Sequence, residues 1–354
     1  MVSSARPTTP RRSSWDVLRA VAILLVVLQH ATWGGPLLMP ELGTRPFEMS
    51  VQVGASTLMV ISAYFVCQTL SSSGAWLLLR NRLGRMLPPF AVASVITYAV
   101  TRWFGPDALG RDGDDLVATL LVLPPGLSAE LDLVDPSYWT VPLQVLAFVT
   151  AAVLWRTRSR NGWRLRMVLW AAVIAPIVIS AVVLPLDDSG RLAALHGDLG
   201  VHRTHLFAAG AALWLWATGR AGPTLLLLIP AAVGAHHFHT EDLPSSLALG
   251  MACGLIATAA TGPDWSHPTL RPLIWLAGIS YGIYLVNHSI GYTVMYQLQQ
   301  AGASPTTQCA AMVAASIALG WLLTRAVERP VAKWITTAWP DAIPAPNPTS
   351  FGPR

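Results

Sequence analysis

The sequence predicts an all-α protein, a polytopic bundle of about ten transmembrane helices with both termini on the cytoplasmic side. Of its 354 residues, 53% are hydrophobic and only 12% are charged, which is too little charge to cover a water-soluble domain of this size. The apolar residues also fall in runs of about 18 to 25, the length that crosses a bilayer as a helix. Finally, the basic and acidic residues fall in alternate loops, as the positive-inside rule expects.

Hydropathy places the spans in order along the chain. They are 16–33, 49–70, 86–103, 138–155, 167–186, 203–218, 222–237, 244–262, 273–297 and 306–325. The first carries Asp16 and Arg19 and has no small-residue cleavage site after it, so it is expected to be retained. The segment 116–126 is too short to cross and ends in two prolines, which favours an outer re-entrant or interfacial helix.

Charge gives the orientation. Arginine-rich loops at 80–85, 156–166 and 325–333 are assigned to the cytoplasm, and the acidic loops at 107–135 and 187–198 to the opposite side. The domain division is a cytoplasmic tail over 1–14, one membrane domain over 15–336 and a second tail over 337–354, both tails being expected to be disordered. The basic balance therefore reflects membrane topology and indicates no nucleic-acid partner.

The first span carries the sharpest functional candidates. Arg19 and His30 are eleven residues apart, about three helical turns, so they share one face about 16 Å apart along the axis. Asp16 lies one turn from Arg19 and can neutralise it. A cation near the inner surface suits an anionic ligand, and a deeper imidazole suits proton transfer near neutral pH. The alternative is that both side chains snorkel to the two interfaces.

A second polar group lies in the ninth span, SYGIYLVNHSIGY. Tyr281, Tyr284 and His288 are spaced to form a stripe on one helix face, with Asn287 beside them. Such a stripe must face protein or a cavity, although it could serve only to hydrogen-bond neighbouring helices.

Histidines also gather in an outer segment, HHFHTED, at His236, His237 and His239. This segment is expected to be an outer loop, and because no second ligand pair stands at a supporting spacing, no metal is predicted. His196, His202 and His205 lie near another outer segment, where they could line an acceptor entrance, although loop histidines in solvent are favoured. The three cysteines lie in apolar runs and predict neither a disulfide nor a metal knuckle.

With these motifs in order, the chain resembles the membrane acyltransferase family 3. The opening WDVLRAVAILLVVLQHA is similar to that family's first span, with an Arg, ten intervening residues and a His. Further segments that match in order are ISAYFV, NRLGRMLPPF, YWTVPLQ, HLFAAGAAL, ISYGIYLVNHSI and VERPVAKWI. The likeness runs from about 15 to 336.

The resemblance implies transfer of an acyl group, expected to be acetyl, from cytoplasmic acyl-CoA to a hydroxyl of a glycan or secondary metabolite. Arg19 and His30 would be the catalytic pair, with His30 as general base, and Arg82 and Arg85 would bind the CoA phosphates. Trp139, Gln144, Tyr281, Tyr284, Asn287 and His288 would line the substrate pocket, and Asp16, Glu328 and Arg329 would have structural roles. Acyl-CoA would be a donor substrate, with no permanently bound cofactor, and the setting would be a bacterial cytoplasmic membrane.

Two positions depart from the family's pattern. Gln144 stands where a carboxylate is usual, and Asn287 stands where a histidine is usual, with His288 one place later. A shift of one residue turns a side chain by about 100° on a helix, so His288 is not expected to replace it directly. Two other classes remain open at this point: a secondary transporter, which would favour inverted repeats that the chain lacks, and a membrane protein that binds acyl-CoA without turnover.

Overall fold

The chain folds as an all-α bundle, as the sequence predicts. A computed structural model describes residues 12–124, 131–157 and 162–338, so most of the two predicted tails lies outside the described residues. The structure is 82% helical, and no strand occurs in the described ranges.

Seven helices in the described part of the chain are long and apolar enough to cross a membrane. They are Ser13–Leu38, Gly54–Ser73, Ala75–Phe104, Pro136–Trp155, Trp163–Leu186, Leu243–Thr261 and Pro305–Ala338. Within and between them the α-helices are α1 (Ser13–Gln29), α2 (Gly35–Leu38), α3 (Gly54–Ser73), α4 (Ala75–Phe104), α5 (Gly113–Leu120), α6 (Thr140–Thr157), α7 (Trp163–Val178), α8 (Arg191–Asp198), α9 (Thr204–Ala217), α10 (Leu228–Thr240), α11 (Leu243–Thr261), α12 (Arg271–Ala277), α13 (Ser280–Val286), α14 (Ser289–Gln300), α15 (Pro305–Leu323) and α16 (Arg329–Ala338).

Three of the ten predicted spans are shorter or less regular than expected. The helices α9 and α10 have 14 and 13 residues, fewer than a perpendicular crossing needs. The predicted span 273–297 is divided into α12, α13 and α14, with a 52° bend between Pro268–Ala277 and Ser280–Val286. Counting that bent pair as one span gives up to eight, so ten spans and the N-in, C-in orientation stay predictions.

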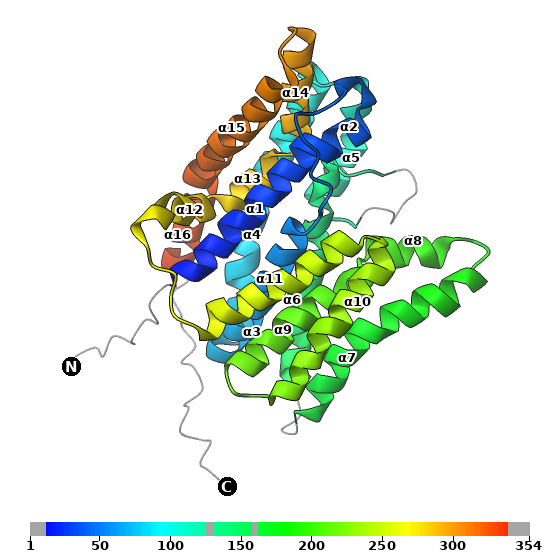
Figure 1. Cartoon of the computed structure of the whole chain (residues 1–354), viewed down its shortest axis with the longest axis vertical. Helices are drawn as coiled ribbons and strands as arrows, with labels where there is room; N and C mark the ends of the chain where they lie inside the picture. The colour runs from blue at the N-terminus through cyan, green and yellow to red at the C-terminus, as the bar shows by residue number, and fades with distance from the viewer. Residues whose placement is uncertain (1–11, 125–130, 158–161, 339–354) are drawn as a thin grey trace.

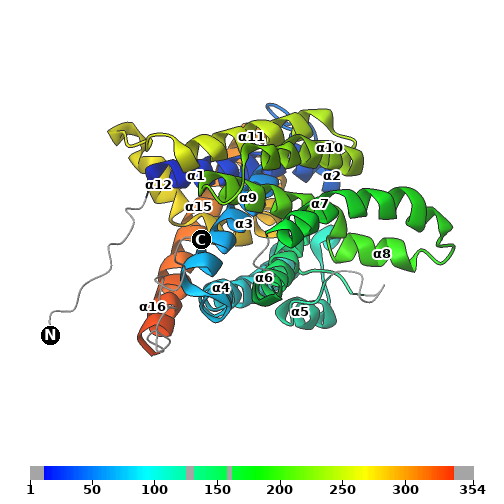
Figure 2. The same cartoon turned by 90° about the horizontal axis from the view of Figure 1, so that it is seen from below.

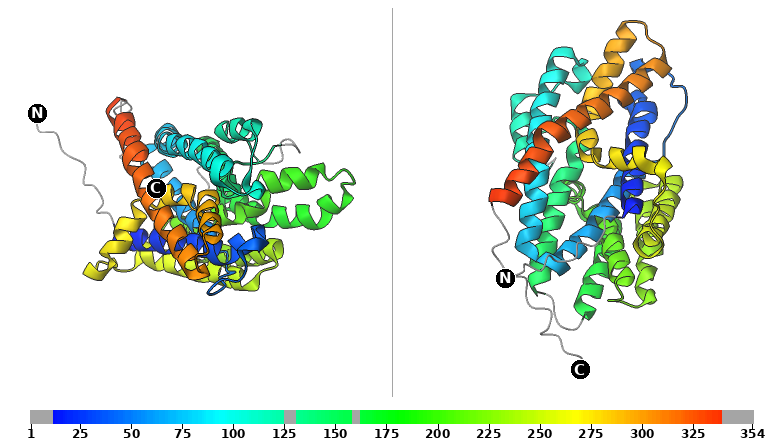
Figure 3. Two further views of the ribbon diagram at one scale, coloured as in Figure 1. Left: turned by 90° about the horizontal axis from the view of Figure 1, so that it is seen from above. Right: turned by 90° about the vertical axis from the view of Figure 1, so that its left-hand side faces the viewer.

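The helix α1 lies in the middle of the bundle (Figure 1). One buried apolar cluster joins it to α3, α7, α9, α10 and α11, and a second joins it to α4, α6, α12, α13 and α15. Both views of Figure 3 show α1, in dark blue, between α11 and the α13–α15 group. Figure 2 shows α7 and α8 extending from the bundle on the side away from α12.

Glycines permit the closest helix contacts. A Cβ added at Gly210 of α9 would lie 2.3 Å from the Val60 carbonyl oxygen of α3, and one at Gly282 of α13 would lie 2.3 Å from the Gly320 carbonyl oxygen of α15. Small residues at crossing points are typical of membrane helices, where close packing replaces the hydrophobic effect between helices. Large apolar side chains on the outer surface, such as Trp103, Leu186 and Met251, complete the pattern of a protein with lipid as its solvent.

Candidate active site

A cavity of about 670 Å³ opens between α1, α3, α4, α6 and α13. Its lining includes four arginines, Arg19, Arg82, Arg85 and Arg329, against one carboxylate, Glu328. The residues that sequence reasoning assigned to CoA binding therefore lie in one strongly positive cavity. Such a cavity attracts anions, and guanidinium groups bind phosphate oxygens in a bidentate way.

The arginines differ in how far their charge is already balanced. Arg85 Nη2 lies 3.2 Å from Glu328 Oε1, and Arg19 Nη1 lies 4.0 Å from Asp16 Oδ1. The guanidinium of Arg82 packs 5.8 Å from the ring centre of Phe148. Among the described residues, no carboxylate lies within salt-bridge range of Arg82. Its charge is therefore available to an anion that binds in the cavity.

The lining of the cavity also includes polar groups from α6 and α13. Tyr281 donates its hydroxyl hydrogen to the Met86 carbonyl at 2.9 Å. Thr140 donates to the Tyr284 hydroxyl oxygen at 2.7 Å, and Tyr284 in turn donates to the Ser137 carbonyl. Gln144 is also part of this lining.

Beyond Tyr284 lies a buried polar centre around His30, which begins a π-helical turn over His30–Gly34 at the end of α1. His30 Nδ1 and Asn287 Oδ1 are 2.6 Å apart. The Asn287 amide nitrogen donates to the carbonyls of Ile283 at 3.3 Å and Tyr284 at 2.7 Å. Those contacts assign the amide oxygen as acceptor, so neutral His30 carries its proton on Nδ1 and keeps the Nε2 lone pair for chemistry.

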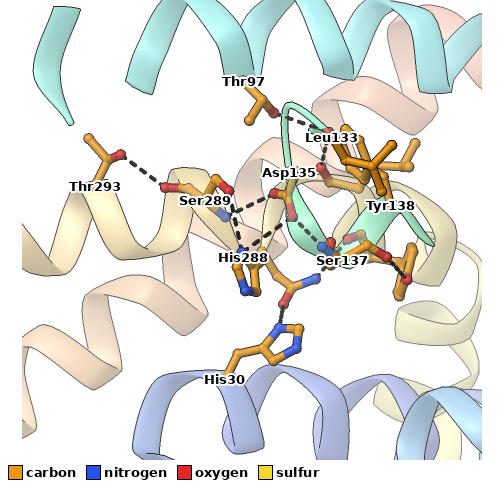
Figure 4. A network of polar contacts seen from close by, with 12 residues as sticks. His30, Thr97, Leu133, Asp135, Ser137, Tyr138, His288, Ser289 and Thr293 are labelled. Atoms are coloured by element: carbon orange, nitrogen blue, oxygen red, sulfur yellow. Dashed lines mark hydrogen bonds and ion pairs between the residues drawn. The ribbon is translucent and has the colours of Figure 1, made fainter. Parts of the chain in front are cut away.

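Asp135 and His288 form a second pair in the same centre (Figure 4). Asp135 Oδ1 lies 3.3 Å from His288 Nδ1, and Asp135 is fully buried. The rings of His288 and His30 meet edge to face with centres 4.8 Å apart. Sequence reasoning missed Asp135, which it counted only among the acids of an outer loop.

The expected polar stripe on one continuous helix is wrong. Tyr281 and Tyr284 do lie on α13, but this helix ends at Val286, and His288 stands in the break before α14. Two contacts favour the break, one local and one tertiary. The Asn287 side chain donates to the carbonyls of Ile283 and Tyr284, one turn earlier in α13. Asp135 Oδ2 accepts the Ser289 backbone N–H at 2.9 Å.

Arg19 and His30 do not line one shared cavity. Arg19 is in the cavity wall, whereas His30 is one residue beyond it, behind the Asn287 side chain that bridges the Tyr284 carbonyl and His30. Trp139 is outside the lining too, with the Arg203 guanidinium 3.9 Å from its ring centre.

Comparison with known families decides the class of the protein. The model of the membrane acyltransferase family 3, an acyltransferase domain, matches residues 12–325, most of the chain. The chain belongs to this family. Comparison with curated proteins and with solved structures gives no match. As a member of the membrane acyltransferase family 3, the protein is a membrane acyltransferase.

The two departures from the family's pattern have different surroundings. Gln144 lies in the cavity wall, whereas Asn287 is fully buried and bonded to His30. In this family member, therefore, an amide takes the position beside the first-span histidine, and the nearest imidazole is His288.

The outer histidines lie on helices and not in a solvated loop, so that expectation is wrong. His236 and His239 belong to α10, and His205 Nε2 of α9 lies 3.1 Å from His236 Nδ1. Burial lowers the pKa of His202, just before α9, to about 4, so this side chain is neutral at pH 7. Across the described residues, no group of three or more His, Cys, Asp or Glu side chains could hold a metal ion.

Proposed function

We propose that this membrane acyltransferase moves an acyl group, expected to be acetyl, from cytoplasmic acyl-CoA to a hydroxyl group of a glycan or secondary metabolite. The observation that carries the proposal is an arginine-rich cavity close to the His30 imidazole, whose Nδ1 is hydrogen-bonded to Asn287. The cavity can bind a polyanionic donor, and the imidazole can act as a base through its Nε2. We assign the protein to a bacterial cytoplasmic membrane, with the cavity open to the cytoplasm.

The donor binds first. Arg82, Arg85 and Arg19 hold the phosphates of CoA, and the pantetheine arm extends along the wall formed by Tyr281 and Tyr284. Charge-assisted hydrogen bonds of this kind contribute about 1.5–3 kcal/mol each, enough to fix the donor at one end. The thioester then lies beside Tyr284, at the part of the cavity wall that the Asn287 side chain separates from His30. For the reaction, either the Asn287 side chain moves aside or the acceptor hydroxyl extends past it to His30.

The transfer follows by direct attack. His30 Nε2 removes the proton from the acceptor hydroxyl, and the resulting oxygen nucleophile attacks the thioester carbonyl. The C–S bond breaks, the acyl group stays on the acceptor, and the CoA sulfur takes the proton from the imidazolium, which restores His30. General base catalysis of this type contributes about 10²–10⁴-fold in rate.

The test is acyl-CoA consumption by purified protein with glycan or polyol acceptors and radiolabelled or mass-shifted acetyl-CoA. His30→Ala and Arg19→Ala are each expected to lower turnover by about tenfold or more, the first through kcat and the second mainly through KM for the donor. Matched controls are His237→Ala and Arg102→Ala, which remove an exposed imidazole and an exposed guanidinium. Folded His30 and Arg19 variants with wild-type turnover would refute the mechanism.

A further inference from the structure

The carboxylate of Asp135 is fully buried in the bundle, and both of its oxygens have polar partners. Its Oδ1 accepts the Ser137 backbone N–H at 2.8 Å, and its Oδ2 accepts the Ser289 backbone N–H at 2.9 Å. His288 Nδ1 completes the set at 3.3 Å from Oδ1. These three polar partners compensate the carboxylate for its full burial.

This carboxylate favours the tautomer of His288 that carries its proton on Nδ1. His288 Nδ1 lies 3.3 Å from both Asp135 Oδ1 and Ser289 Oγ, and a proton on this nitrogen leaves the Nε2 lone pair available. His30 has the same arrangement, but its partner is the neutral amide oxygen of Asn287. A carboxylate stabilises an imidazolium by full charge, whereas an amide does so only by its dipole, so His288 has the better environment for accepting a proton.

The groups that face His288 come from four elements. They are Asp135 from the segment before α6, His30 from the end of α1, Tyr292 from α14, and Arg111, whose charge acts on His288 from the segment before α5. The Tyr292 ring centre lies 4.4 Å from that of His288, and its buried hydroxyl has no hydrogen-bond partner among the described residues. A buried unsatisfied hydroxyl is unfavourable, so a polar ligand group is the expected partner.

We propose that His288 is a second general base of this reaction centre and that Asp135 is the positioning residue that makes it one. The inference rests on the proposed function. In this route His288 Nε2 removes the acceptor's hydroxyl proton, Asp135 stabilises the imidazolium, and the acceptor oxygen attacks the thioester carbonyl. The C–S bond then breaks, and the CoA sulfur takes the proton back from His288, so the pair is restored with Asp135 unchanged.

A purely structural role for the pair gives different results. Asp135 also caps the short helical turn Pro136–Trp139 and holds the first residue of α14, so it would matter for folding even without chemistry. In that case His288 would only fill space, and replacing it by an isosteric amide would leave the dependence of turnover on pH unchanged.

The experiment compares His30→Gln, His288→Gln and the double variant, with kcat/KM measured between pH 5 and 9. If His288 is a base, His30→Gln keeps measurable turnover with an acidic limb, and the double variant loses about a further 10²-fold or more. His237→Gln, which changes an exposed histidine, is the matched control. A double variant as active as His30→Gln alone overturns the inference, and so does a His30→Gln variant without turnover.

Adding Asp135→Asn to His30→Gln tests the positioning role. Loss of the carboxylate weakens His288 as a base, so the acidic limb is expected to move down by about 1–3 pH units while the plateau falls. A lower plateau with an unmoved limb would mean that Asp135 is structural. Should Asp135→Asn fail to fold, the histidine variants still decide the matter. If wild-type protein consumes no acyl-CoA, the proposed function itself fails, which is distinct from an active enzyme that ignores His288.

Discussion

Replacing Asn287 by alanine separates the chemistry of His30 from its surroundings. The variant removes three hydrogen bonds: one from His30 Nδ1 at 2.6 Å and two to the carbonyls of Ile283 and Tyr284. The variant leaves the Nδ1–H group of His30 without an acceptor, which lowers the free energy of unfolding by about 1–3 kcal/mol. The two carbonyls end α13, where water or a shifted backbone N–H can replace the amide.

The expected loss of activity exceeds the loss of stability. Without Asn287 Oδ1 nothing fixes the His30 proton on Nδ1, and the ring can turn away from the acceptor. Misplacement of a catalytic group by about 1 Å costs about 10²-fold in rate. We therefore expect kcat to fall about 10²-fold, while KM for acyl-CoA changes little, because the arginines of the cavity are untouched.

The assays are steady-state acyl transfer and thermal unfolding in the same detergent. Gln297→Ala is the matched control, since it removes a side-chain amide that donates to the Phe104 carbonyl at an exposed position. A folded Asn287→Ala variant with kcat within twofold of wild type would refute the assignment of Asn287 as the residue that orients His30.

Three further predictions concern the cavity, the packing and a loop carboxylate. Arg82→Ala should raise KM for acyl-CoA about tenfold or more and Arg85→Ala less, because Arg85 is already paired with a glutamate; equal effects would contradict this assignment. Gly282→Ala should destabilise by about 1–3 kcal/mol through overlap with α15, whereas Gly254→Ala, with open space around it, should not, and unchanged unfolding temperatures for both would refute the close contact. A hydrogen bond from a backbone N–H at the start of α1 lowers the pKa of Asp264, so its stabilisation is complete above pH 3.8 and is lost as the pH falls through the lower folded value. The difference in unfolding temperature between wild type and Asp264→Asn should therefore shrink from pH 7 to pH 3; a constant difference would contradict the prediction.

Hydropathy predicted the helical class because a membrane span must satisfy its backbone internally over a fixed thickness. The same rule works poorly where several helices shield one another from lipid. The helices α9 and α10 pack against α3, α7 and α11, and their apolar residues fill a protein core, so an apolar run there need not have the length of a crossing. The arginine cavity was foreseeable in part, since basic residues clustered in the NRLGRMLPPF segment.

The Asp135–His288 pair was not foreseeable from local pattern. The two residues are separated by 153 positions, and Asp135 stands in a segment rich in other acids, Asp132 among them. Its one local signal is the Asp-Pro step before Ser137, which is typical of a capped turn and says nothing of a distant imidazole. The break after Val286 was hidden for a related reason. Helix periodicity continues through the sequence, and one of the two contacts that favour the interruption is the tertiary contact from Asp135 to Ser289.

The two departures from the family pattern gain a common explanation from this geometry. The chain has an amide at 144 and at 287, where a carboxylate and an imidazole are usual, yet its buried centre contains both groups, at Asp135 and His288. A buried carboxylate is costly unless it is hydrogen-bonded, and here two backbone N–H groups meet that condition while the imidazole lies within ion-pair range. Asp135 has a structural role as the acceptor for two backbone N–H groups, but that role does not require an imidazole at position 288. The placement of His288 against this carboxylate, with its ring centre 4.8 Å from that of His30, therefore supports the proposed chemical role.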